Sequence, residues 1–133
     1  MASGATSVNR KVNNFFITSE LKATEVSRDV WTCTRHCRLV NVREIHSVVG
    51  GSSAAVRPRK ITDTSAPGAA AGATVLEVAA SIDLTATINT IIKPALTATN
   101  STLRFKPGDR LAQIGSGTLT GIVGVVTYEF EPI

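Results

Sequence analysis

Apolar and polar side chains alternate most regularly near the end of the chain, over residues 126–131. Val126, Tyr128 and Phe130 take every second position, and hydroxyl or acidic side chains fall between them. A period of two, with one apolar and one polar face, is typical of an antiparallel strand that is buried on one side. We therefore predict a long final strand whose three large side chains point into a core.

A tight turn is predicted shortly before this strand, at residues 106–110. Pro107 has the φ angle that the second position of a turn prefers, and Gly108 tolerates the positive φ that the third position of a type II turn requires. A carboxylate at Asp109 can accept backbone N–H groups in such a turn. We expect it to serve the turn, and we do not expect it to act as a catalytic acid.

Weaker alternation predicts further strands between residues 37 and 105. Residues 82–88 alternate cleanly, and residues 89–98 predict another strand. Over residues 40–49 the apolar phase changes, with Val40 and Val42 on one face and Ile45 and Val49 in the opposite phase, which predicts a bulge near Arg43-Glu44.

Breaks in the pattern complete this outline. Pro58 interrupts residues 54–61, which predicts an edge or bulged strand there. Residues 64–72 are small and predict a loop, and residues 75–80 are compatible with a short helical turn. Counting from Cys37, we expect seven or eight short strands separated by turns. The predicted fold class is all-β, a jelly-roll or β-sandwich domain over residues 37–133.

The first 36 residues are less regular and form a predicted N-terminal extension. They contain two apolar groups, Phe15-Phe16 and Trp31. One interpretation is an arm that reaches a partner with aromatic anchors. The alternative is a pair of edge strands packed on the body.

Composition and charge narrow the function classes. Aromatic residues make up 5% of the chain, and the net charge is +4. Residues 1–60 hold ten Lys and Arg against four Asp and Glu, whereas residues 61–133 hold four against six. The basic residues are dispersed and lack interleaved aromatics, so a nucleic-acid platform is not expected. No apolar run is long enough to span a bilayer, and no signal peptide is visible, so we expect synthesis in a cytoplasm and no membrane partner.

Candidate chemistry is sparse. Cys33 and Cys37 with His36 and His46 have the composition of a zinc site but not its usual spacing, so we expect reduced thiols, with a disulfide as the alternative after oxidation. Neither histidine lies in a motif of nucleophilic catalysis. We therefore expect no enzyme activity, no metal and no cofactor.

Several segments resemble the C-terminal part of small structural proteins of tailed bacteriophages. The resemblance covers roughly residues 37–133 and is carried by VREIHSVVG at 42–50, RKITD at 59–63, APG at 66–68, LRFKPGDRL at 103–111, GTLT at 117–120 and GIVGVVT at 121–127. Proteins of this kind are usually capsid decoration (cement) proteins, head fibres or other virion surface parts. The resemblance implies a virion protein on the capsid surface that stabilises a phage head by bridging subunits of the major capsid protein.

This interpretation leads to a docking hypothesis. The expected assembly is a homotrimer in which neighbouring chains complete one another's cores and hide strand edges. The residues expected to dock on the capsid all lie in the N-terminal extension: Phe15, Phe16, Trp31, Arg10, Lys11, Lys22 and Arg28. The alternative function is a head-fibre or tail-tip module that contacts host glycans.

Overall fold

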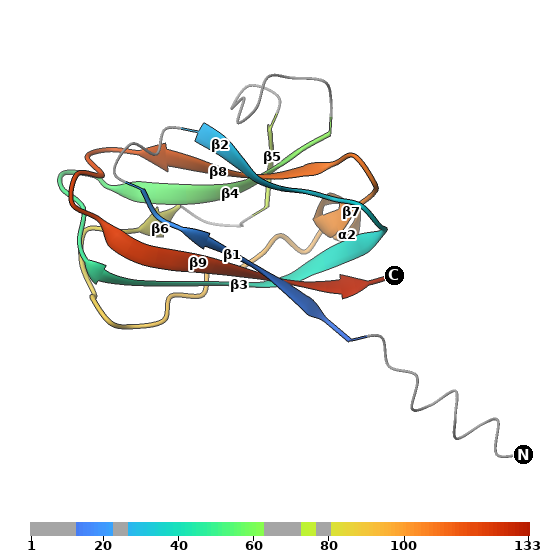
Figure 1. Ribbon diagram of the computed structural model, residues 1–133, viewed down its shortest axis with the longest axis horizontal. Helices are drawn as coiled ribbons and strands as arrows, with labels where there is room; N and C mark the ends of the chain where they lie inside the picture. The colour runs from blue at the N-terminus through green and yellow to red at the C-terminus, as the bar shows by residue number, and fades with distance from the viewer. Residues whose placement is uncertain (1–12, 23–26, 63–72, 77–80) are drawn as a thin grey trace, which may run out of the picture.

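The computed structural model describes residues 13–22, 27–62, 73–76 and 81–133, which form two antiparallel sheets packed face to face (Figure 1). The first sheet has the order β1-β9-β3-β7, with bounds Phe15–Glu20, Val123–Pro132, Cys37–Val48 and Arg104–Phe105. The second has the order β2-β8-β4-β5, with bounds Ser27–Thr32, Arg110–Ser116, Ala55–Ile61 and Ala73–Val75. A short β6, Ile82–Asp83, pairs with β4, and α2 spans Asn100–Leu103. The predicted all-β sandwich is confirmed.

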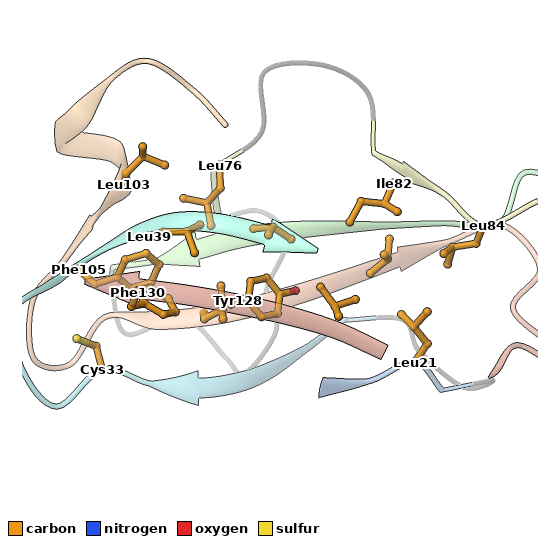
Figure 2. Packing of buried hydrophobic residues seen from close by; sticks show 14 of the residues in the cluster. Leu21, Cys33, Leu39, Leu76, Ile82, Leu84, Leu103, Phe105, Tyr128 and Phe130 are labelled. Atoms are coloured by element: carbon orange, nitrogen blue, oxygen red, sulfur yellow. The ribbon is translucent and has the colours of Figure 1, made fainter. Parts of the chain in front are cut away.

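The core lies between the two sheets, and β9 supplies its centre as predicted. Val126, Tyr128 and Phe130 are fully buried. Phe105 meets Phe130 edge to face with ring centroids 5.2 Å apart, and Figure 2 shows these rings with Tyr128 between the layers. The hydroxyl of Tyr128 donates to Oε1 of the buried Gln113 at 2.7 Å, so the polar end of this ring is satisfied inside the core.

The irregularity in β3 lies at a different position from the predicted bulge. Its pairing with β9 shifts between Leu39 and Asn41, earlier than the bulge expected near Arg43-Glu44, and again between His46 and Val48. An extra residue in a strand moves every following side chain to the other face. Beyond the first shift, Glu44 and His46 therefore point inward, and Ile45 is exposed.

The strands predicted over residues 82–88 and 89–98 are mostly absent. Only Ile82–Asp83 is a strand, and Ile92 makes a single bridge to Glu44. Thr87 and Asn89 have φ angles of 60° and 56°, which extended strands do not allow. The alternation of residues 82–88 thus ends at Leu84, and this segment forms a loop beside β3.

Pro58 lies in β4 at a gap in its second ladder. Opposite β8, Pro58 pairs with Gln113. On the other side, β6 pairs with residues 55–56 and β5 with residues 59–61, so the described residues offer no partner to residues 57–58 there. The predicted edge or bulged strand is therefore wrong, because β4 lies inside its sheet and pairs with β8 without a register shift. Pro58 is tolerated there because a residue without an N–H suits a locally open position.

Two sequence predictions near the turns have different outcomes. Gly108 has a φ of 97°, and the amide of Lys106 donates to Oδ2 of Asp109 at 2.9 Å, so the turn and the role of its carboxylate are confirmed. The helical turn expected over 75–80 begins instead as strand β5, which ends at Val75, and residues 77–80 lie outside the described residues.

The predicted extension contributes two edge strands. β1 pairs with β9 from Phe15↔Phe130 to Glu20↔Val125, and β2 pairs with β8. No boundary between an arm and a body therefore falls at residue 36, because residues on both sides of it share the same sheets. Of the two interpretations of this segment, packed edge strands are what the structure shows.

Within the described residues, no helix is both long and apolar enough to cross a membrane.

Candidate interaction surface

The outward side of the first sheet carries a group of exposed or half-buried apolar side chains, which we call the outer apolar face. It consists of Phe16 on β1, Ile45 on β3, Val123 and Val125 on β9, and Ile91 from the adjoining loop. Phe16 is 55% exposed, Ile91 57% and Val123 54%. Contiguous apolar surface of this kind is typical of binding sites rather than of free protein surface.

Cross-strand register brings part of this face together, and Phe16 lies opposite Glu129, four residues along β9 from Val125. Ile45 is paired with Val125, and Val125 is paired on its other side with Glu20 of β1. Directly opposed residues of neighbouring antiparallel strands share one face. Residues separated by some eighty positions in sequence therefore form one surface.

Two adjoining hollows shape this face. The larger has a volume of about 430 Å³ and runs over Leu21, Ile45, Val123 and Val125, and the smaller, about 270 Å³, lies between Phe16, Ile45, Ile91 and Val125. Ile45 and Val125 line both hollows.

Gly124 lets β9 come close to β3 at this point. A Cβ on Gly124 would lie 2.7 Å from the Cβ of His46 and from the carbonyl oxygen of Ile45. The floor of the larger hollow therefore depends on a glycine between two apolar residues.

A buried polar pair lies directly beneath Ile45. Nδ1 of His46 is 2.7 Å from Oε1 and 3.0 Å from Oε2 of Glu44, and both side chains are fully buried. Nε2 of His46 donates to the carbonyl oxygen of Ala86 at 2.6 Å. Because a carbonyl can only accept, Nε2 carries a proton, and a second proton is held between Nδ1 and the carboxyl group.

Burial governs the electrostatics of this pair. Desolvation raises the pKa of Glu44 above its usual value, and the hydrogen bond and charge of His46 work in the opposite direction. Both ring nitrogens of His46 are engaged, so this imidazole has no free position for proton transfer to a ligand. Among the described residues, no group of three His, Cys, Asp or Glu is arranged to hold a metal ion.

The pair attaches the loop after β6 to the free edge of β3. The backbone of Glu44 exchanges two hydrogen bonds of 2.8 Å with Ile92, and the carbonyl oxygen of His46 accepts from the amide of Asn89 at 2.7 Å. These bonds, together with the one to Ala86, place Ile91 beside Ile45. The inward pair is thus the internal support of the outer apolar face.

Charged side chains border the apolar residues. Arg43 lies 3.7 Å from Glu129 across β3 and β9, and Asn14 donates to the same carboxylate at 2.8 Å. Glu20 lines the opposite end, beside the larger hollow. Arg43 and Thr127 also line the smaller hollow, so apolar and polar side chains lie together on this face.

The structure separates the three aromatic residues that were expected to dock. Phe15 stacks on Phe130 with centroids 5.5 Å apart, and Trp31 lies 4.9 Å from the same ring. Both side chains are therefore committed to the protein's own core, contrary to the anchor role expected for them. Phe16, the next residue on the alternating strand β1, points outward and remains available.

The basic residues of the docking hypothesis are also placed differently. Arg28 joins the two sheets: its Nη2 donates to Oγ of Ser19 at 2.8 Å and to the carbonyl oxygen of Glu20 at 2.6 Å. Lys22 is exposed just after β1. Arg10 and Lys11 lie outside the described residues, as does the loop 64–72.

Sequence reasoning missed most of the outer apolar face. The sequence places Ile45 only in the opposite phase to Val40 and Val42, and it places Ile91 in a predicted strand, because alternation reveals that residues share a face but not which face is inside. The combination of Glu44 and His46 two positions apart in an apolar strand was a usable signal, since a carboxylate and an imidazole can satisfy each other when buried.

The two cysteines lie side by side in the core, near the turn at residues 106–109. Their Sγ atoms are 3.7 Å apart, both are free thiols, and both side chains are buried. Burial, followed by the hydrogen bond and charge of Cys33, raises the pKa of Cys37 to about 12. The reduced thiols expected from the sequence are what the structure shows.

Comparisons of the chain with protein families, with curated proteins and with solved structures find no match.

Proposed function

We propose that this protein is a structural virion component of the capsid decoration (cement) type, which binds neighbouring subunits of a major capsid protein through its outer apolar face. The observation that carries the proposal is the group of exposed apolar side chains around Phe16 and Ile45 on a preformed sheet. The link to virions rests on the sequence resemblance to small structural proteins of tailed bacteriophages.

The geometry of this face suits rigid binding between proteins. Strands β1, β9 and β3 hold Phe16, Val125 and Ile45 in place before any partner arrives, so little conformational freedom is lost on association. Aromatic side chains near the centre of an interface commonly provide much of the binding energy. A decoration protein works by adding buried area across subunit junctions, which makes dissociation of the shell more costly.

The order of the strands supports a jelly-roll within the sandwich class. From β1 to β4, successive strands alternate between the two sheets, and they do so again from β7 to β9. The jelly-roll, built from two Greek keys, is an architecture of viral capsid and lectin domains. Because one fold serves many functions, this order supports the proposal without carrying it.

The basic residues that precede β1 have a defined role in this proposal. Arg10 and Lys11 come a few positions before Phe16 in the chain. They meet acidic surface of the capsid subunit and orient the approach of the outer apolar face. Charges at the border of an interface act mainly on association rate and orientation.

Assembly as a trimer belongs to the same proposal. A sandwich of this size has a small core, and its edge strands β1 and β2 have one free side each among the described residues. A cyclic arrangement covers such edges and presents three apolar faces to a symmetric junction of the shell.

The proposal is tested by binding to capsids purified without this protein. Replacing Phe16 and Ile45 by Ser removes two apolar anchors on exposed positions and leaves the core intact. The matched control is Val75→Ser, because Val75 is 50% exposed on β5 of the other sheet. We expect the double variant to lose particle binding and the control to bind as the unmodified chain does. Full occupancy by the double variant would refute this docking surface.

A further inference from the structure

A third hollow lies away from the outer apolar face, where the end of β4 meets α2, β7 and the turn at residues 106–109. Its volume is about 420 Å³, and its walls include the basic side chains of His36, Lys60, Arg104 and Lys106. Asp109 is the one acidic residue among those that line it. The charged side chains that line the hollow are therefore mostly positive, and its wall also includes Thr62, Ser101 and the C-terminal residue Ile133.

Lys60 is the unusual member of this set, because its residue is only 6% exposed. Its Nζ donates to the carbonyl oxygens of Arg104 at 3.0 Å and Ser101 at 3.2 Å, and it lies 5.5 Å from the centre of the Phe105 ring. An ammonium group has three donors, and these contacts use two of them. The described residues provide neither an acceptor for the third donor nor a carboxylate in ion-pair contact with Lys60.

Burying an ammonium group without a counter-charge is costly, and proteins normally pair such groups. The acidic residue in the lining, Asp109, accepts a hydrogen bond at Oδ2 from the amide of Lys106 at 2.9 Å and so serves the turn. Burial lowers the pKa of Lys60, and the charge of Asp109 offsets this only in part. Within the described residues, Lys60 is thus a buried positive charge that has no carboxylate in ion-pair contact.

The rim of the hollow has the remaining parts of an anion site. Arg104 and Lys106 are exposed on either side of the buried Phe105, so their charged ends are free to reach a ligand. No hydrogen bond or ion pair engages either side chain within the described residues. A guanidinium group can hold two oxygens of a carboxylate or phosphate at once, and an ammonium group adds a point charge.

We propose that this hollow binds an oxyanion, a carboxylate or phosphate group, with Lys60 at its base and Arg104 and Lys106 at its rim. The ligand oxygen takes the third donor of Lys60 and supplies a negative charge in direct contact with it. This site lies apart from the outer apolar face, so it goes beyond the proposed docking function and does not depend on it.

The test measures binding of inorganic phosphate and, separately, of citrate by isothermal titration and by NMR shifts of the amides of residues 101–109, at constant ionic strength. The variant Arg104→Gln/Lys106→Gln removes both rim charges. Its control, Arg57→Gln/Lys93→Gln, makes the same change in net charge at exposed positions away from the hollow. We expect a loss of at least about tenfold in affinity in the rim variant, as removal of charge-assisted hydrogen bonds implies, and an unchanged affinity in the control.

The two anions distinguish the chemistry of the ligand. Tighter binding of phosphate assigns a phosphate site, and tighter binding of citrate assigns a carboxylate site. A further variant, Lys60→Met, should abolish saturable binding of both. Absence of saturable binding to the unmodified protein, or an equal loss of affinity in the rim and control variants, would overturn the proposal.

Discussion

Glu44 and His46 form a closed hydrogen-bonded pair on the inner side of β3, with Nδ1 of the imidazole within 3.0 Å of both carboxylate oxygens. The pair is fully enclosed, and its outer nitrogen holds the carbonyl oxygen of Ala86. Two polar residues in the core thereby support an apolar surface on the opposite side of the same strand.

Breaking this pair is expected to be costly. Glu44→Ala leaves a buried imidazole without its partner and should lower the free energy of unfolding by about 3–5 kcal/mol, as for other broken buried pairs. Urea unfolding measures the change. The variant Glu44→Leu/His46→Leu removes both partners and should recover much of the loss. Glu20→Gln, on the exposed face of β1, should stay within about 0.5 kcal/mol of the unmodified protein; a similarly small effect of Glu44→Ala would show that the pair contributes little.

The burial of Lys60 should make the stability of the protein depend on pH in the alkaline range. Burial lowers its pKa in the folded state below the ordinary value of 10.5. Between these two pKa values the unfolded chain binds more protons than the folded one. The free energy of unfolding therefore rises as pH increases from the folded pKa to 10.5, and it falls as pH drops back through the same window. In Lys60→Met this contribution is absent. The difference in unfolding free energy between the unmodified protein and Lys60→Met should therefore shift in favour of the unmodified protein as pH rises toward 10.5, and a difference independent of pH would contradict the assignment.

Two truncations test which N-terminal residues the fold requires. Removing residues 1–12 should leave the circular dichroism and the thermal unfolding midpoint unchanged, because β1 begins at Phe15. Removing residues 1–30 should destabilise the protein strongly, because it deletes β1 and most of β2 and uncovers Phe130, on which Phe15 stacks. Retention of a cooperative β-rich fold after the longer truncation would show that the edge strands are dispensable.

The thiols are expected to be unreactive in the folded protein. Since the pKa of Cys37 is raised to about 12, its thiolate fraction at pH 8 is on the order of 10⁻⁴, and the thiolate is the reactive form. Mass spectrometry after brief iodoacetamide treatment at pH 8 should find Cys37 unmodified, and the same treatment in denaturant should modify it fully. Rapid labelling of Cys37 under native conditions would contradict its burial.

The mass in solution tests the proposed trimer. Light scattering at micromolar concentration should give three times the chain mass of 14.0 kDa. A clean monomer would refute the trimer for the free protein.

The sequence alone determined the features that depend on neighbouring residues. The inward stripe of β9 follows from strict alternation over Val126, Tyr128 and Phe130, and the turn at Gly108 follows from the backbone freedom of glycine next to proline. The all-β class follows from many short β-rich runs between turn residues, none of which requires knowledge of a distant partner.

Only the tertiary structure decided which side of each strand is inside. A single register shift after Leu39 turned Ile45 outward and Glu44 inward, and no local pattern reports such a shift because both phases look alike along the chain. The partners of β1 and β2 were equally undetermined, since β9 lies 105–115 residues beyond β1 in the chain and β8 lies 78–87 residues beyond β2.

 Phe15, for example, lies opposite Phe130, and Thr32 lies opposite Arg110.

Contacts between residues so distant in sequence are set by the whole fold, because each strand settles where its apolar face meets a surface that other strands have built. The same reason explains Lys60 and the outer apolar face. In the sequence, Lys60 looks like an ordinary surface residue, and only the positions of α2 and β7 cover it. Phe16, Ile45 and Ile91 become one surface only when β1, β3 and the loop after β6 assemble around β9.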